Sequence, residues 1–136
     1  MKMKTYRRLV SCFLGSAALL AAGAASAHHS FAMFDQTKCR TLTGKVVRFD
    51  LAYPHSWIWL NVRDKSGSET RWAFEGLDPA SLRVMGWTPR SLKNGETIAI
   101  SFHPLRDGRP GGAAARVRKQ DGSEQIMRAK ACAIEQ

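Results

Sequence analysis

The chain has few acidic residues, few cysteines and few histidines. Its 136 residues include 11 Asp and Glu against 21 Lys and Arg, with three Cys and four His. No Ser, His and acid stand at a spacing typical of hydrolases, so we expect no catalytic residues and rank an enzyme below a binding protein. The chain is too short for a second domain of ordinary size, and it contains no internal repeat or low-complexity tract.

Residues 1–27 predict a signal peptide. The stretch "MKMKTYRR" carries four positive charges and no acid, the next seventeen residues carry no charge, and the triplet "ASA" ends directly before His28. The apolar run is short and rich in small residues, so an uncleaved anchor helix is the weaker alternative. We expect a periplasmic or secreted protein, without a transmembrane segment after cleavage, whose residues 28–136 form one barrel domain with an extended N-terminal segment.

The positive charge predicts anionic partners. Cleavage before His28 would remove four positive charges and lower the net charge from +10 to +6. A basic exported protein favours lipid headgroups, cell-wall polymers, acidic small ligands or an envelope protein. Nucleic acid is not expected as a partner outside the cytoplasm.

Two cysteines remain after the leader, Cys39 and Cys132, 93 positions apart. An oxidising compartment favours a disulfide between them, which would constrain the unfolded chain by about 4 to 5 kcal/mol in the loop-entropy model. Two buried free thiols are the alternative. Metal binding by this pair ranks last, because neither cysteine has another Cys or a His at ligand spacing.

The pattern of the mature chain is mainly β. Strands are expected at 41–50, with a bulge or bend at Gly44, and at 56–64, 69–75, 97–103, 113–119 and 124–129. Residues 77–87 change to a helical period, with Asp78 as N-cap and Gly86 as terminator. This order predicts a small OB-fold-like Greek-key barrel of five or six strands, with one short helix between the third and fourth strands.

Cleavage before His28 would create a metal ligand pair. The new α-amine and the imidazole of His28 lie in one residue, as in the histidine brace of copper proteins, and nitrogen ligands favour Cu(II) over zinc. His29, His55 and His103 are the candidates for the second imidazole. Cleavage one residue earlier would instead resemble an amino-terminal copper-nickel motif. The alternative is a solvated and mobile N-terminus without metal.

The other two histidines also have an ordinary explanation. His55 follows Pro54 and is expected at the mouth of a barrel, where ligands bind. His103 precedes Pro104 and carries a weaker version of the same prediction. A turn histidine bonded to the backbone is the alternative for both. All four histidines are expected at the edges of elements, and none within an apolar strand face.

Aromatic and basic residues suggest a ligand site of another kind. Trp57 and Trp59, together with Trp72, Phe74 and Phe102, would form a stacking platform for a sugar or a base; core packing is the stronger alternative. Arg106 and Arg109 would grip an anion beside glycines that expose backbone amides, or would simply flank a tight turn. Glu75 and Asp78 do not make a convincing acid-base pair.

The chain resembles a family of small exported bacterial proteins classed as a domain of unknown function. The resemblance covers nearly the whole mature chain and rests on motifs at Ala27–Phe31, Phe34 with Asp35, Gly44 with Val46, Pro54 with His55, Trp72 with Glu75, Gly86 with Trp87, Leu92–Gly95 and His103–Gly108. Tyr53 stands where the family has Asn. The resemblance implies export and a compact β domain, and it implies no activity.

Two hypotheses follow from the sequence. One is a periplasmic copper-binding protein that uses His28 with His29, His55 or His103. The other is a non-catalytic barrel that binds an anionic envelope ligand or a partner protein, with Arg106, Arg109, Trp57 and Trp59 as the candidate residues. An enzyme ranks third and would need a redox-active copper.

Overall fold

The computed structural model describes residues 31–128 and residue 132. The chain divides into two compact units, Met1–Met33 and Phe34–Gln136, and the fold belongs to the second. Its elements are, in order, β1 (Arg40–Asp50), β2 (Trp57–Arg63), β3 (Glu69–Glu75), α2 (Pro79–Val84), β4 (Thr97–Pro104), β5 (Gly111–Lys119) and β6 (Glu124–Ile126). Each predicted strand and the predicted helix is present, with shifted ends.

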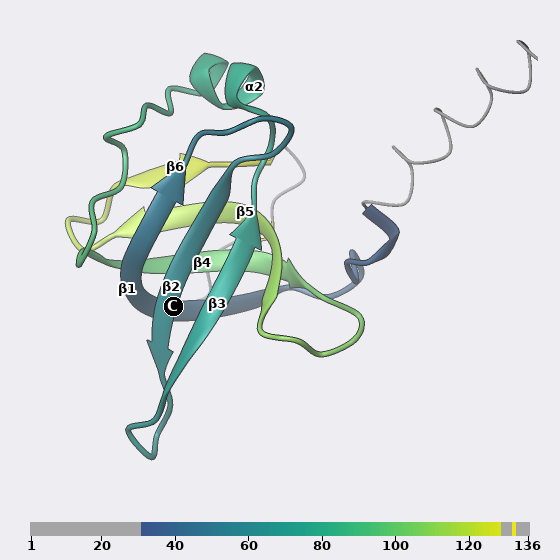
Figure 1. Ribbon diagram of the computed structural model, residues 1–136, viewed down its shortest axis with the longest axis vertical. Helices are drawn as coiled ribbons and strands as arrows, with labels where there is room; N and C mark the ends of the chain where they lie inside the picture. The colour runs from purple at the N-terminus through teal and green to yellow at the C-terminus, as the bar shows by residue number, and fades with distance from the viewer. Residues whose placement is uncertain (1–30, 129–131, 133–136) are drawn as a thin grey trace, which may run out of the picture. The chain divides into compact units, whose positions relative to one another are not determined.

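The strands form one sheet that closes on itself (Figure 1). The strand order is β3-β2-β1-β4-β5-β6, and β3 also pairs with β5 in parallel, from Ala73 with Gly111 to Glu75 with Ala113. Five strands therefore make a closed barrel, and β6 is an extra strand beside β5. Together with a single short helix between β3 and β4 in this part of the chain, the topology confirms the predicted OB-fold-like barrel.

Alternation along the strands separates the core from the outer surface. Ile58 and Leu60 of β2 are fully buried, whereas Trp57 and Trp59 lie on the other face and are only half-buried. Phe74 and Phe102 meet edge to face in the core, with ring centroids 4.8 Å apart. Core packing is therefore the role of the two phenylalanines, whereas the tryptophans of β2 remain accessible on the surface.

Two glycines let β5 approach its neighbours. A Cβ on Gly112 would lie 2.4 Å from the carbonyl oxygen of His103, and one on Gly111 would lie 2.6 Å from that of Ala73. Any larger residue would push β5 away from β4 or β3 and open the barrel. The sequence predicted both glycines in the loop before this strand, and they instead begin β5.

The predicted bulge lies elsewhere. The register between β1 and β2 shifts between Val46 and Arg48, so the irregularity follows Gly44 by several residues. A Cβ on Gly44 would lie 2.8 Å from the carbonyl oxygen of Asn61, which explains the glycine by the close approach of β2. Gly44 itself pairs regularly with Ile98 of β4.

The helix forms as its sequence predicts. Asp78 caps it, because its Oδ1 accepts hydrogen bonds of 3.0 Å from the backbone N–H groups of Ala80 and Ser81, and Pro79 occupies the first turn. Gly86 follows with φ +87° and ends it. Across the described residues, no helix has the length and apolar character needed to span a membrane.

A disulfide joins Cys39 to Cys132, with the Cα atoms 5.7 Å apart. Cys39 directly precedes β1, and the carbonyl oxygen of Cys132 accepts a 2.8 Å hydrogen bond from the Ser101 hydroxyl in β4. The predicted pairing is confirmed, and the alternative of two free thiols does not apply.

Candidate functional site

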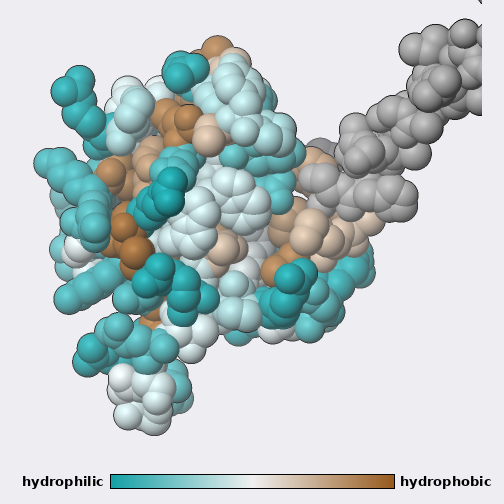
Figure 2. Space-filling view, viewed as in Figure 1, coloured by the Kyte–Doolittle hydropathy of each residue, from teal (hydrophilic) through white to brown (hydrophobic). Residues whose placement is uncertain are grey.

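The outer surface of β1, β2 and β3 carries two tryptophans beside charged residues of both signs. We name it the tryptophan face after its two cross-strand rows, Asp50–Trp57–Glu75 and Arg48–Trp59–Ala73. These side chains point away from the core because they alternate with the buried residues of the same strands. Figure 2 shows pale surface of intermediate hydropathy over β2 and β3, bordered by hydrophilic side chains.

The two tryptophans form a stacked pair. The ring centroids of Trp57 and Trp59 are 5.9 Å apart, with 25° between the ring planes. The Arg48 guanidinium carbon lies 5.3 Å from the centroid of Trp59, a cation–π distance, while its Nε donates a 2.8 Å hydrogen bond to Asp50. The face therefore combines flat aromatic surface with an oriented cation, which suits a ligand with a ring and a negative charge.

The loop between β4 and β5 borders this face. The N–H of Ala73, the cross-strand neighbour of Trp59, donates a 3.3 Å hydrogen bond to the carbonyl oxygen of Pro110. Arg109 precedes Pro110, and its Nε donates a 2.7 Å hydrogen bond to Asp107. Arg106 has Nη1 4.0 Å from Asp35. Both predicted arginines are exposed and each has an acidic neighbour, so an anionic ligand would compete with that neighbour.

His55 pairs with a buried carboxylate at the other border. Its Nδ1 lies 3.1 Å from Oε1 of Glu75, whose side chain is 7% exposed against 34% for His55. The structure thus joins the predicted candidate His55 to Glu75, for which no convincing role was predicted. The alternative of a turn histidine bonded to the backbone does not describe this contact.

Burial dominates the electrostatics of Glu75. Desolvation raises the pKa of this carboxyl above its ordinary value, and the charges of His55 and Arg128 oppose that shift only in part. Desolvation also lowers the pKa of Arg128. Ser56, the residue after His55, has a buried hydroxyl. Among the described residues this hydroxyl has no hydrogen-bond partner. The cluster fixes the loop before β2 against β3.

His103 is the last but one residue of β4, close to the edge of the element as expected. It is 9% exposed, and its ring nitrogens both lie 3.9 Å from Sγ of Cys132. Nδ1 is 2.8 Å from the carbonyl oxygen of Lys38. Neither cysteine has a His nearby in the sequence, but the fold brings His103 to both of them.

The remaining copper candidates, His28 and His29, lie outside the described residues. His55 faces Glu75 and His103 faces the disulfide, so each of the described histidines has its own partner. The copper site at the mature N-terminus stays a prediction, as does the signal peptide.

A separate groove of about 190 Å³ lies over β1, β4 and β5. Thr43, Thr97 and Lys119 are among its lining residues, and none of the sequence-predicted site residues lines it. It offers a second surface against which binding at the tryptophan face can be compared.

Two members of the candidate site, Arg48 and Glu75, were not predicted as site residues. Arg48 lies opposite Trp59 only because of the register shift in β1. No local sequence pattern predicts that shift. Glu75 had a signal, because the family motifs that carry the resemblance include both His55 and Glu75. The two side chains are in contact, from the loop before β2 to the last residue of β3.

Comparisons with known proteins point to one family. The family model described as "Family of unknown function (DUF6152)" matches residues 17–115. No curated protein and no solved structure matches the chain. The matched range covers most of the chain, including β1 to β4 and the first part of β5. The chain belongs to this family of unknown function, DUF6152.

Proposed function

We propose that this protein is a non-catalytic binding module for an acidic carbohydrate of the cell envelope, and that the tryptophan face is its binding site. The observation that carries the proposal is the stacked pair Trp57–Trp59 with Arg48 over Trp59, half-buried on the outer face of β2. The two tryptophan rings lie outside the core, so packing of the barrel interior does not explain them.

The position of this pair agrees with how the fold class binds ligands. OB-fold barrels bind oligosaccharides and oligonucleotides on the face of their second and third strands, between the β1–β2 and β4–β5 loops. Trp57 and Trp59 lie on that face, with His55 in the first of these loops and Arg109 in the second. Sugar rings stack on indole faces, and guanidinium groups bind carboxylates or phosphates through paired hydrogen bonds.

The expected compartment favours carbohydrate over nucleic acid. The Cys39–Cys132 disulfide supports an oxidising environment, and the leader pattern of residues 1–27 supports export. The excess of Lys and Arg would attract acidic polymers of the envelope and speed their encounter with the barrel.

Binding of a defined acidic oligosaccharide tests the proposal. The purified oxidised protein is titrated with a hexamer of galacturonic acid, with calorimetry as the readout. We expect saturable binding that weakens steeply between low and physiological salt, because exposed charge pairs are screened over about 8 to 10 Å. The methyl-esterified hexamer keeps the rings but lacks the charges, and it should bind at least about tenfold more weakly.

Variants locate the site. Trp59→Ala and the double variant R106A/R109A should each weaken binding of the hexamer. The matched control is R83A/R90A, which removes the same charge from exposed positions in and after α2 and should leave affinity unchanged. Salt-independent binding, equal binding of the esterified hexamer, or equal losses in both double variants would overturn the proposal. Binding to phosphatidylglycerol vesicles without binding to the hexamer would do so as well.

A further inference from the structure

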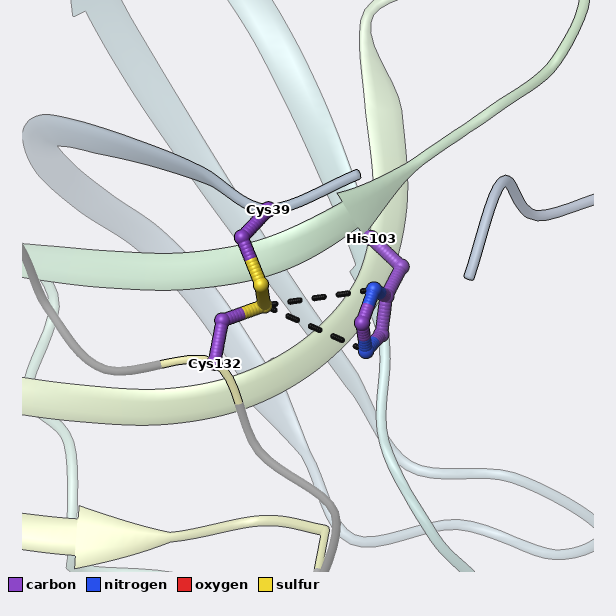
Figure 3. Close-up of side chains that lie close together, drawn as sticks. All are labelled: Cys39, His103 and Cys132. Carbon is purple, nitrogen blue, oxygen red and sulfur yellow. Dashed lines mark hydrogen bonds between the residues drawn. A yellow bond between two sulfur atoms is a disulfide. The ribbon is translucent and has the colours of Figure 1, made fainter. Parts of the chain in front are cut away.

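Cys39, His103 and Cys132 meet at one point of the barrel although they are far apart in sequence (Figure 3). Their possible ligand atoms, two sulfurs and one imidazole nitrogen, all lie within 4.8 Å of one another. Cys132 is 8% exposed and His103 is 9% exposed, whereas Cys39 is exposed. The group is thus nearly closed to solvent at Cys132 and His103, while Cys39 is exposed as a residue.

The hydrogen bond of His103 prepares its ring for a metal. The Lys38 carbonyl oxygen, 2.8 Å from Nδ1, only accepts, so Nδ1 carries the hydrogen and donates it. In the neutral ring Nε2 then holds the free electron pair, and it lies 3.9 Å from Sγ of Cys132. A ring N–H donated to a backbone carbonyl is the arrangement that orients metal-binding histidines.

The backbone around the site is held independently of the S–S bond. Arg40, directly after Cys39, pairs with Phe102 of β4. The carbonyl oxygen of Cys132 accepts the 2.8 Å hydrogen bond from Ser101, also in β4. Both cysteines therefore stay beside His103 in β4 when the S–S bond is broken, which a metal site in the reduced protein requires.

We propose that the reduced protein binds one Cu(I) ion through Cys39, Cys132 and His103, and that the disulfide switches this site off. Two thiolates and one imidazole are soft ligands of the kind that select Cu(I). A structural zinc site would need a fourth ligand, and among the described residues the metal-binding group has only these three. The site is separate from the tryptophan face and from the predicted N-terminal copper site.

A small thiol can reduce the Cys39–Cys132 disulfide and so open the site. A thiolate attacks the sulfur of Cys39, the exposed residue of the pair, forms a mixed disulfide and releases the Cys132 thiolate. A second thiol attacks that mixed disulfide, so two thiols become one small disulfide and two electrons pass to the protein. Cu(I), supplied as such, then binds both sulfurs, and any protons they carry are released. The copper does not change its oxidation state.

Competition for Cu(I) tests the site. The full-length protein carries Cys12→Ser, so that only the two relevant cysteines remain, and it is reduced with a phosphine and desalted without oxygen. Cu(I) held by the chromophoric ligand bicinchoninate is then added, and loss of the coloured complex measures transfer. We expect one Cu(I) per reduced chain and none per oxidised chain. X-ray absorption of the loaded protein should detect two sulfur ligands and one nitrogen ligand.

Four variants distinguish this site from others. Cys132→Ser should abolish the uptake, and His103→Ala should weaken it by at least about tenfold. His55→Ala is the matched control and should leave it unchanged. Equal uptake by oxidised and reduced protein, or uptake that survives Cys132→Ser but is lost in H28A/H29A, would overturn the proposal. Loss of the β-sheet circular dichroism on reduction would also overturn it, because the site requires the fold.

Discussion

Nδ1 of His55 lies 3.1 Å from Oε1 of Glu75, and this contact joins the loop before β2 to the last residue of β3. Glu75 is also the cross-strand neighbour of Trp57. The pair therefore fixes one border of the tryptophan face, while the hydrogen bond between Ala73 and Pro110 fixes the other. A rigid border keeps a binding surface in shape before the ligand arrives.

Replacing Glu75 with Gln should change how stability depends on pH. Burial raises the pKa of Glu75 above its ordinary value of 4.5, so the folded chain keeps this proton to higher pH than the unfolded chain does. The native state then binds more protons at this carboxyl, and its contribution to stability falls as pH rises above about 4.5. Glu75→Gln lacks this titration, so the free energy of unfolding of the wild type should decline relative to the variant as pH rises from about 4.5.

Urea unfolding at a series of pH values measures this difference. Glu124→Gln serves as control, because it removes a carboxylate that is exposed to a greater extent, on β6. A difference between wild type and Glu75→Gln that stays constant over this pH range, or that grows in favour of the wild type, contradicts the assigned burial of Glu75.

Removing the disulfide should destabilise the barrel strongly. The bond closes a loop of 93 residues, for which the chain-entropy model gives about 4 to 5 kcal/mol. We expect C39S/C132S to lose about that much of its free energy of unfolding in urea. Reductant should lower the stability of the wild type to the level of the variant and leave the variant itself unchanged. Equal stability of the two oxidised proteins would contradict the assigned constraint.

Gly112→Ala should destabilise the protein more than an alanine at a turn glycine does. The new Cβ would meet the His103 carbonyl at 2.4 Å, which forces β5 away from β4 and costs about 3 kcal/mol or more. Gly95→Ala meets no atom but must adopt φ +84°, which costs about 1 to 2 kcal/mol. Thermal unfolding should rank Gly112→Ala clearly below Gly95→Ala, and the reverse order would contradict the closure of the barrel at this point.

Much of the fold follows from local patterns. The run from Trp57 to Leu60 predicts a strand, and the Asp78 cap with Pro79 predicts the start of α2. These features depend on neighbours a few residues away, so the sequence displays them directly. The order of the elements then allows only a few sheet topologies. The predicted one, an OB-fold-like barrel, is the one observed.

The candidate sites depend on contacts that no local pattern encodes. Trp57 lies opposite Glu75 because residues 64–68 form a loop of a particular length, and one residue more or fewer would turn Glu75 to the other face. His103 meets Cys132 only once the chain has passed through β5 and β6. The start of β5 at Gly111 could not be predicted either, because glycine is typical of loops. Its place in a strand depends on the close approach of Ala73 in β3, which the sequence does not display.

The indole N–H signals in a nitrogen–proton correlation spectrum test the central claim most directly, because the chain has four tryptophans in different settings. When the galacturonic acid hexamer is added, the signals of Trp57 and Trp59 should shift and saturate together. The signal of Trp87, whose buried Nε1–H donates to the Ile126 carbonyl at 2.8 Å, should stay in place. Unchanged Trp57 and Trp59 signals, with shifts confined to the groove of Thr43, Thr97 and Lys119, would contradict the proposed binding site.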